Sequence, residues 1–179
     1  VWFGTPGGVC RYDGKTWIPY LQGEYIEYTA VNPTNGDFWA VSYYMVFRIS
    51  GGQVFRYDPT NSDLPDYGAL GVDISQDGVV WISGCNWIAR FDGTVWRAYT
   101  SWNDGIPGIC YGPLKIDMST GRMWVMEYHG YDLLSFDGSR WAWFGLLPDT
   151  RLYDFNIGNQ GDLWFANLWG ELGPELLLY

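Results

Sequence analysis

One pair of side chains in this sequence has the types and spacing needed for acid–base chemistry. His129 is the only histidine, and Glu127 lies two positions before it. Residues two apart on an extended strand point to the same side, so the two side chains would be neighbours. A histidine beside a carboxylate is a minimal general acid–base pair, suited to a lyase-like reaction. The alternative is that His129 is a polar surface residue in a tyrosine-rich loop.

Other chemical motifs are weak or missing in the sequence. It contains no nucleophile elbow around a serine, no HExxH and no glycine-rich phosphate loop. Oxygen-bearing side chains alternate at Asp58, Asn61 and Asp63, but this segment lacks the glycine and distal glutamate of an EF-hand loop. We therefore expect a chain without a required cofactor, with calcium as the candidate ion.

The charge balance excludes several classes of partner. The chain has 20 acidic and 10 basic residues, for a formal net charge of −10, and Lys15 and Lys115 are its lysines. Binding to phosphates or to an anionic membrane surface needs clustered basic residues, so we expect no nucleic-acid partner. No apolar run approaches the length of a membrane-spanning helix, so we expect no membrane span. A divalent cation, a neutral sugar or a basic partner is compatible with this charge.

The elements that position these residues are indicated by an internal repeat. Aromatic residues make up 20% of the chain and there are 24 glycines, a composition typical of short strands and tight turns. An apolar-Trp segment recurs at spacings of 37, 42, 43 and 40 residues, at Trp2, Trp39, Trp81, Trp124 and Trp164. A second anchor follows four of these tryptophans: RYDGKTW, RISGGQVF, RFDGTVW and SFDGSRW. Its Asp-Gly or Gly-Gly pair predicts a hairpin turn.

Two further anchors complete the unit. A glycine lies three residues before each later tryptophan, at Gly36, Gly78, Gly121 and Gly161, and Leu-Pro or Ile-Pro loops join the units. Each unit therefore predicts four short strands in a meander. A period of about 40 residues is typical of a β-propeller blade, so we expect an all-β propeller with about five blades. The alternative, an irregular β-sandwich, gives no reason for four anchors to repeat in register.

The segment VWFGTPGGVCRYDGKTW resembles the two-component-regulator propeller repeat. The resemblance extends over nearly the whole chain, although Ala40-Val41-Ser42 and Val125-Met126-Glu127 replace the Phe-Gly-Thr found at residues 3–5. It implies a sensor-type propeller outside the cytoplasm, often one that recognises glycans, and related propellers include a lyase that acts on cyclic peptide antibiotics. The repeat is structural and implies no catalytic residue here. We expect an extracellular or periplasmic protein.

The predicted blades are incomplete at both ends. We place them at residues 1–27, 28–68, 69–112, 113–151 and 152–179, within a single domain. The first lacks its first strand and the last lacks its fourth, so 18 strands are expected. Three explanations remain open: a fragment of a larger propeller, a ring that tolerates two three-stranded blades, or neighbouring copies that cover the open edges.

Propeller topology predicts where a ligand would bind. The loops after the second and fourth strands of each blade share one face, and variable loops are better functional candidates than repeated turns. On this face we expect ligand-binding residues Tyr43, Tyr44, Asn86, Trp87, Tyr128, His129, Tyr131, Trp102 and Trp169. The same loops also contain Glu171, Tyr25, Tyr67, Asn103, Asp104, Tyr111 and Tyr153. The alternative for each aromatic residue is packing between blades.

Two other sets of residues have structural explanations. An Asn or Asp ends the first strand of four units, at Asn32, Asp73, Asp117 and Asn156, and we expect these side chains to cap the following turn, with a polar ring at the axis as the alternative. Cys85 and Cys110 lie in loops on the same face, so they are the disulfide candidates. Cys10 is expected to be a buried thiol.

Three functions follow from this sequence, in order of preference. The first is a non-catalytic recognition or scaffold propeller that binds a glycan or peptide at its axial face. The second is a structural subunit that assembles with other copies of itself through its incomplete terminal blades. The third is a lyase-like enzyme that uses Glu127 and His129.

Overall fold

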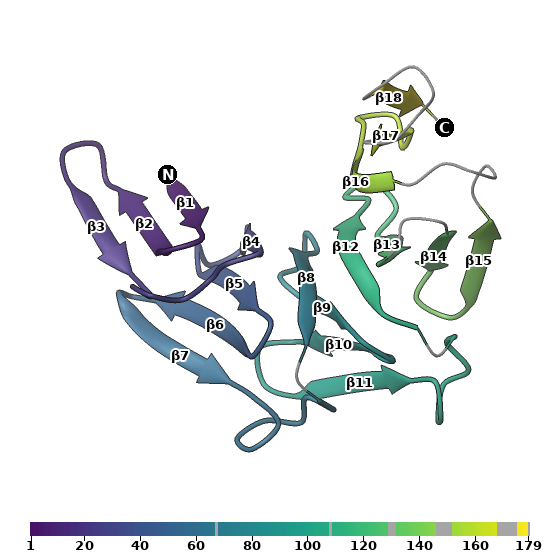
Figure 1. Ribbon diagram of the computed structural model, residues 1–179, viewed down its shortest axis with the longest axis horizontal. Coiled ribbons are helices and arrows are strands. Elements are labelled where there is room, and N and C mark those ends of the chain that lie inside the picture. The colour runs from purple at the N-terminus through teal and green to yellow at the C-terminus, as the bar shows by residue number, and fades with distance from the viewer. Residues whose placement is uncertain (67, 108, 129–131, 146–151, 168–174, 179) are drawn as a thin grey trace.

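The computed structural model describes residues 1–66, 68–107, 109–128, 132–145, 152–167 and 175–178. These residues form five antiparallel sheets. The sheets follow one another along an arc around a common centre (Figure 1). The two terminal sheets have three strands and the three between them have four, which confirms the all-β propeller with incomplete terminal blades.

Within each sheet the strands pair in chain order, as a meander. The first sheet contains β1 (Trp2–Thr5), β2 (Gly8–Tyr12) and β3 (Trp17–Tyr20). The second contains β4 (Tyr28–Val31), β5 (Phe38–Ser42), β6 (Met45–Ser50) and β7 (Gln53–Tyr57). The third contains β8 (Ala69–Ile74), β9 (Val80–Gly84), β10 (Trp87–Phe91) and β11 (Trp96–Thr100). The fourth contains β12 (Tyr111–Ile116), β13 (Met123–Glu127), β14 (Asp132–Phe136) and β15 (Trp141–Gly145), and the fifth β16 (Leu152–Ile157), β17 (Leu163–Asn167) and β18 (Glu175–Leu178).

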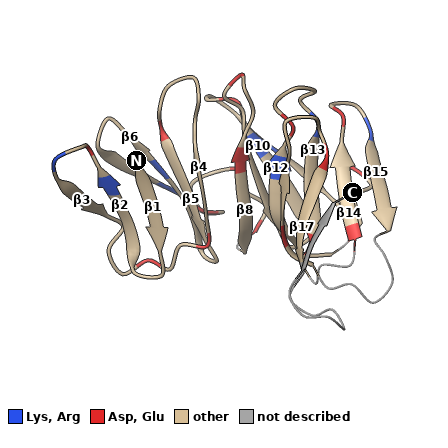
Figure 2. Ribbon diagram, turned by 90° about the horizontal axis from the view of Figure 1, so that it is seen from above, with Lys and Arg blue, Asp and Glu red and all other residues tan. Residues whose placement is uncertain are grey.

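The first strands of the second, third, fourth and fifth sheets lie at the centre of the arc. β8 contacts both β4 and β12, and β12 contacts β16. Figure 1 shows these four strands around the central space, with the first and last sheets at opposite ends of the arc. Between the described parts of these two sheets the arc is open (Figure 1). From the side, the strands stand upright in a row, and many acidic residues lie in the turns that connect them (Figure 2).

The repeated Asp-Gly turns are scaffold, as the sequence predicts. The Asp13 carboxylate accepts hydrogen bonds from the backbone N–H groups of Lys15 and Thr16, both at 2.8 Å. Asp92 and Asp137 make the same pair of bonds in their own turns. Because these bonds favour the charged carboxylate, they lower the pKa of Asp92 and of Asp137 to about 2.

The repeated tryptophans form the core between neighbouring sheets. Trp2 of the first sheet stacks on Phe38 of the second, with ring centroids 4.5 Å apart. Trp39 of the second sheet packs against Phe91 and Trp96 of the third. Trp81 packs in the same way against Phe136 of the fourth sheet, and Trp124 joins the cluster shared by the fourth and fifth. Each of these tryptophans therefore faces the sheet that follows it.

Trp164 is the last of the repeated tryptophans, and no sheet follows it among the described residues. Trp39 is 1% exposed, whereas Trp164 of the fifth sheet is 36% exposed. At the other end of the arc, Phe3 and Trp17 are exposed on the first sheet, where Trp17 packs against Phe3 and Tyr12. Each end face of the arc therefore carries at least one exposed aromatic ring among the described residues.

Two side-chain hydrogen bonds join the third sheet to the fourth. Ser83 Oγ donates to the carbonyl of Gly112 at 2.6 Å, which ties the third sheet to the fourth. The Asp73 carboxylate accepts from the N–H of Ile116 at 2.8 Å across the same joint, and burial raises its pKa. The expectation that Asp73 caps a turn is therefore wrong, because its side chain crosses to the neighbouring sheet instead.

The other polar residues at the ends of the inner strands are Asn32, Asp117 and Asn156, and they differ in which backbone N–H group their side chains accept from. Asn32 and Asp117 cap the following turns, as expected, by accepting from the N–H groups of Thr34 and Ser119. Bonds from the Ser119 and Thr120 hydroxyls lower the pKa of Asp117 to about 2. Asn156 accepts from the N–H of the next residue, Ile157, at 2.9 Å.

Candidate functional site

A pocket of about 660 Å³ lies at the centre of the arc, where the inner strands begin. Its walls come from the β3–β4 loop, from β4, β8, β12 and β16, and from the residue after β13. The lining residues are Tyr25, Ile26, Glu27, Tyr28, Leu70, Gly112, Pro113, Tyr128, Leu152, Tyr153 and Asp154. We call it the axial pocket.

Irregular strand pairing shapes this pocket. The register shifts between Ala69 and Gly71 in β8, between Tyr111 and Leu114 in β12, and between Leu152 and Asp154 in β16. The residues inside these three shifts are Leu70, Gly112, Pro113 and Tyr153, and all four line the pocket. A β-bulge bends its strand and changes the direction of its side chains. The bulges therefore turn these residues toward the axis.

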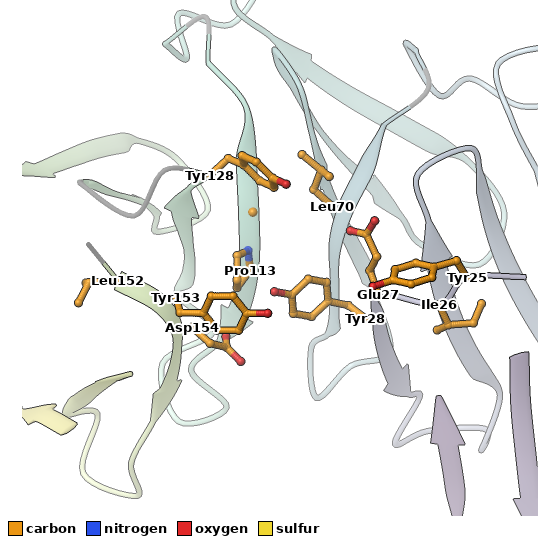
Figure 3. Close-up of a pocket in the computed structure, with 11 residues that line it drawn as sticks. Tyr25, Ile26, Glu27, Tyr28, Leu70, Pro113, Tyr128, Leu152, Tyr153 and Asp154 are labelled. Atoms are coloured by element: carbon orange, nitrogen blue, oxygen red, sulfur yellow. The ribbon is translucent and has the colours of Figure 1, made fainter. Parts of the chain in front are cut away.

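Four tyrosines dominate the walls. Tyr25, Tyr128 and Tyr153 are exposed, whereas Tyr28 is half-buried at the start of β4. Figure 3 shows the hydroxyl groups of Tyr28 and Tyr153 pointing toward one another from opposite sides of the pocket, with Tyr128 above them. The pocket therefore offers both ring faces and phenol hydroxyls to a ligand.

The pocket has a negative electrostatic character. Glu27 and Asp154 supply two carboxylates, and the lining residues that the structure describes include no Lys, Arg or His. Desolvation raises the pKa of Glu27, although its side chain is still accessible to solvent. Desolvation also raises the pKa of Tyr28 far above its ordinary value, and the charges of Asp154 and Glu27 add to this effect. Tyr28 is therefore a neutral phenol at physiological pH.

Among the described residues of the predicted ligand-binding set, one lies in the axial pocket. Tyr128 lines it, and its backbone N–H donates to the carbonyl of Cys110 at 2.8 Å. Tyr43 and Tyr44 lie in the β5–β6 turn, outside the axial pocket, where their rings pack edge to face. Trp102 is 87% exposed in the β11–β12 loop, and Asn86 is exposed in the β9–β10 turn. These four residues are on the surface and do not line the axial pocket.

The prediction for Trp87 is wrong. Its side chain is 2% exposed and belongs to the core between the second and third sheets. The residue begins β10 and pairs with Gly84, and a Cβ atom at Gly84 would overlap the Trp87 ring. The absence of a side chain at Gly84 gives this ring its place, so it packs inside and offers no surface to a ligand.

Several predicted residues lie outside the described part of the chain. These are His129, Tyr131, Trp169, Tyr67 and Glu171. Glu127 is described, at the end of β13, and is 9% exposed. The acid–base pair of Glu127 and His129 therefore stays a prediction.

A disulfide joins Cys85 and Cys110, the two candidate cysteines. It connects the β9–β10 turn to the start of β12, and the two residues also form an isolated β-bridge. Because Cys110 accepts the backbone hydrogen bond of Tyr128, the disulfide also supports one wall of the axial pocket. Cys10 is a free cysteine and half-buried rather than buried, because it lies on the face of the first sheet that no other described sheet covers.

The candidate calcium segment makes its hydrogen bonds internally. Asp58 accepts from the N–H and the hydroxyl of Thr60, and Asn61 accepts from the N–H of Asp58. Within the described ranges, no group of three or more His, Cys, Asp or Glu residues is placed to hold a metal ion.

The fold defines the chain as a β-propeller. The sequence matches no protein-family model and no curated protein. Among solved structures, it is similar to the extracellular domain of a hybrid two-component system, BT3049, from B. thetaiotaomicron, with 17% identity and a TM-score of 0.73 over 99% of this chain and 27% of that one. This confirms, at the level of fold, the resemblance to the two-component-regulator propeller repeat.

Two other solved structures are also similar. One is virginiamycin B lyase from Staphylococcus aureus in a catalytically inactive form with quinupristin, at 18% identity and a TM-score of 0.71 over 97% of this chain and 63% of the lyase. Another is YCF48 bound to D1 peptide, at 16% identity and a TM-score of 0.69 over 97% of this chain and 57% of YCF48. The chain thus spans less than two thirds of each of these proteins. Within its described residues, no helix is long and apolar enough to cross a membrane.

Proposed function

We propose that this chain is a non-catalytic recognition propeller outside the cytoplasm, and that it binds its ligand in the axial pocket. The observation that carries the proposal is the convergence of four tyrosines on one pocket of about 660 Å³, from the β3–β4 loop and from the second, fourth and fifth sheets. A pocket of this size, with aromatic walls and a few polar groups, is typical of a small-ligand or peptide-segment site. The extracellular propeller domain and the peptide-bound propeller among the similar structures support this class of function.

The test is a binding screen with a matched pair of variants. The chain is immobilised and probed with glycan and peptide panels, and each hit is repeated with Tyr153→Ala and Tyr43→Ala. Both side chains are exposed, so neither change is expected to disturb the core, but Tyr153 alone lines the axial pocket. We expect Tyr153→Ala to weaken binding and Tyr43→Ala to preserve it. No hit in either panel, or equal binding by both variants, would overturn the proposal.

A second candidate function is supported by the end faces of the arc. Trp164 presents the ring that, in the first four sheets, packs on the next sheet. At the other end, Tyr12 and Trp17 occupy the positions of Phe91 and Trp96, which receive Trp39 in the third sheet. The fifth sheet of one copy is therefore complementary to the first sheet of another, as expected of a subunit that assembles through its terminal blades.

This second candidate predicts self-association. Sedimentation velocity over a hundredfold concentration range should show assembly that Trp164→Ser and Trp17→Ser each prevent. Trp102→Ser is the matched control, because this ring is highly exposed but lies in a loop rather than on an end face. A chain that stays monomeric at every concentration, or assembly that only Trp102→Ser reduces, would exclude this function.

A further inference from the structure

The axial pocket has a composition that discriminates between classes of ligand. Two carboxylates line it, from Glu27 and Asp154, and none of the other described lining residues carries a cationic side chain. An anionic ligand would be repelled by both groups. A neutral ligand would leave both charges without a partner while displacing part of their water, which costs free energy.

The two carboxylates lie on different walls of the pocket. Glu27 belongs to the loop before β4, and its N–H donates to the carbonyl of Val41 at 3.0 Å, which fixes the backbone there. Asp154 belongs to β16 and accepts from the N–H of Phe155 at 2.8 Å. Figure 3 shows the Tyr28 ring between the two carboxylates and the Tyr153 ring beside Asp154. A single small metal ion prefers several oxygen ligands in one shell, whereas this separation suits a larger group.

The aromatic walls add a second attraction for positive charge. The face of a tyrosine ring attracts an ammonium or guanidinium group through its quadrupole. Tyr28 is a neutral phenol, since desolvation and the nearby negative charges raise its pKa. Its ring therefore adds cation–π attraction without adding a negative charge of its own. The net charge of −10 also favours the approach of cations to the chain as a whole.

We infer that the axial pocket recognises an organic cation, an ammonium or guanidinium group, which lies against the rings of Tyr28 and Tyr153 between Glu27 and Asp154. This inference rests on the proposed function and names the ligand chemistry of the same pocket. The group can belong to a lysine or arginine side chain of a peptide or to a free polyamine. The carboxylates pair with its charge and the rings cover its apolar faces.

The experiment is calorimetric titration with probes that differ in charge. The cationic probes are a tetra-arginine peptide and spermidine, and the matched probes are tetraglycine, tetraglutamate and a neutral chitooligosaccharide. We expect the cationic probes to bind, more weakly as salt increases, and the others to fail. If only the tetra-arginine peptide binds, the recognised group is a side chain of a peptide. If spermidine binds as well, the pocket recognises the cationic group itself, whichever molecule carries it.

Four variants test the position of the bound cation. Glu27→Gln and Asp154→Asn keep the shape of each side chain and remove its charge, and we expect each to weaken binding roughly tenfold. The Asn amide oxygen can still accept from Phe155. Asp63→Asn is the matched control, since it removes one charge from an exposed loop residue outside the pocket. Tyr153→Leu should weaken binding roughly threefold to thirtyfold, and Tyr153→Phe, which keeps a ring, by less.

The outcomes separate this inference from the proposed function. If tetraglycine or the chitooligosaccharide binds in a Tyr153-dependent way and the cationic probes do not, the pocket is a binding site but the cation assignment is wrong. If Asp63→Asn weakens cation binding as much as Glu27→Gln, the attraction is a general charge effect and the assignment is also wrong. If neither these probes nor the glycan and peptide panels bind, the proposed function fails as well.

Discussion

The joint between the third and fourth sheets allows a sharp test of the structure. Gly71 and Gly112 approach closely there, because a Cβ atom on Gly71 would lie 2.5 Å from the carbonyl oxygen of Gly112 and 2.6 Å from Ser83 Oγ. Ordinary contact begins at 3.4 Å, so in Gly71→Ala either the strands separate or the Ser83 hydroxyl gives up its bond to Gly112. Overpacking of this kind costs about 1–3 kcal/mol, and a buried carbonyl that loses its partner costs a similar amount. We expect Gly71→Ala to lower the free energy of unfolding by roughly 3 kcal/mol.

The assay for this prediction is urea unfolding followed by tryptophan fluorescence. The midpoint should fall while the slope with urea stays the same, since the change acts on stability and not on the surface exposed on unfolding. Gly7→Ala is the matched control: the atom nearest to its added Cβ is 4.0 Å away, and its φ lies outside the left-handed region. A Gly71→Ala variant within about 0.5 kcal/mol of the parent would refute the close packing of β8 on β12.

Two further predictions concern the disulfide and acidic pH. Replacing both Cys85 and Cys110 with serine opens a loop of sequence separation 25, and the chain-entropy relation predicts a loss of about 3 to 4 kcal/mol in urea unfolding. An unchanged midpoint would contradict a structural role for this bond. The folded-state pKa values of Asp92, Asp117 and Asp137 are lowered to about 2, so their stabilising contribution is complete above the ordinary pKa of 3.8 and is lost as pH falls toward 2. The thermal midpoint should therefore fall between pH 4 and pH 2, and it should fall less in Asp92→Asn; an identical pH profile for that variant would show that this turn does not contribute.

The fold could be predicted from the sequence because its repeat contains residues with strict local requirements. The glycines at 36, 78, 121 and 161 all adopt positive φ, where other residues are strained, and each precedes a strand that contains the repeated tryptophan. The Asp-Gly and Gly-Gly pairs are hairpin turns for the same reason. Local turn chemistry and the two-residue alternation of strands thus determine the order of strands and turns within each blade.

The candidate site was only partly predictable, because its geometry depends on tertiary detail. Topology placed Tyr25, Tyr128 and Tyr153 on the loop face, but Tyr28, Glu27 and Asp154 were missed. In a regular strand, side chains alternate between the two faces of the sheet. The register shift between β16 and β17 at Tyr153 interrupts this alternation, so the direction of the Tyr153 side chain cannot be counted from its position in the sequence. Gly71 lies next to one bulge, and Gly112 and Pro113 lie within another, so these residues are sequence signals of the irregularities.

The error at Trp87 has a different cause. The residue was assigned to a loop, whereas it is the first residue of β10, and strand alternation then turns its ring into the core. Asn86 marks the true turn, with a positive φ of 66°. A boundary error of one residue was sufficient to exchange a surface ring for a core ring, because side chains alternate between the two faces of a sheet.

The central claim is that the axial pocket is the binding site of this propeller. The most direct measurement is fluorine NMR of the chain labelled with 3-fluorotyrosine, in which the resonances of the 14 tyrosines are assigned by Tyr→Phe substitution. The chain is then titrated with the tetra-arginine peptide and with each hit from the panels. The account predicts that the resonances of Tyr25, Tyr28, Tyr128 and Tyr153 shift together while those of Tyr43 and Tyr44 stay in place. Shifts confined to Tyr43 and Tyr44, with the four pocket tyrosines unchanged, would contradict it.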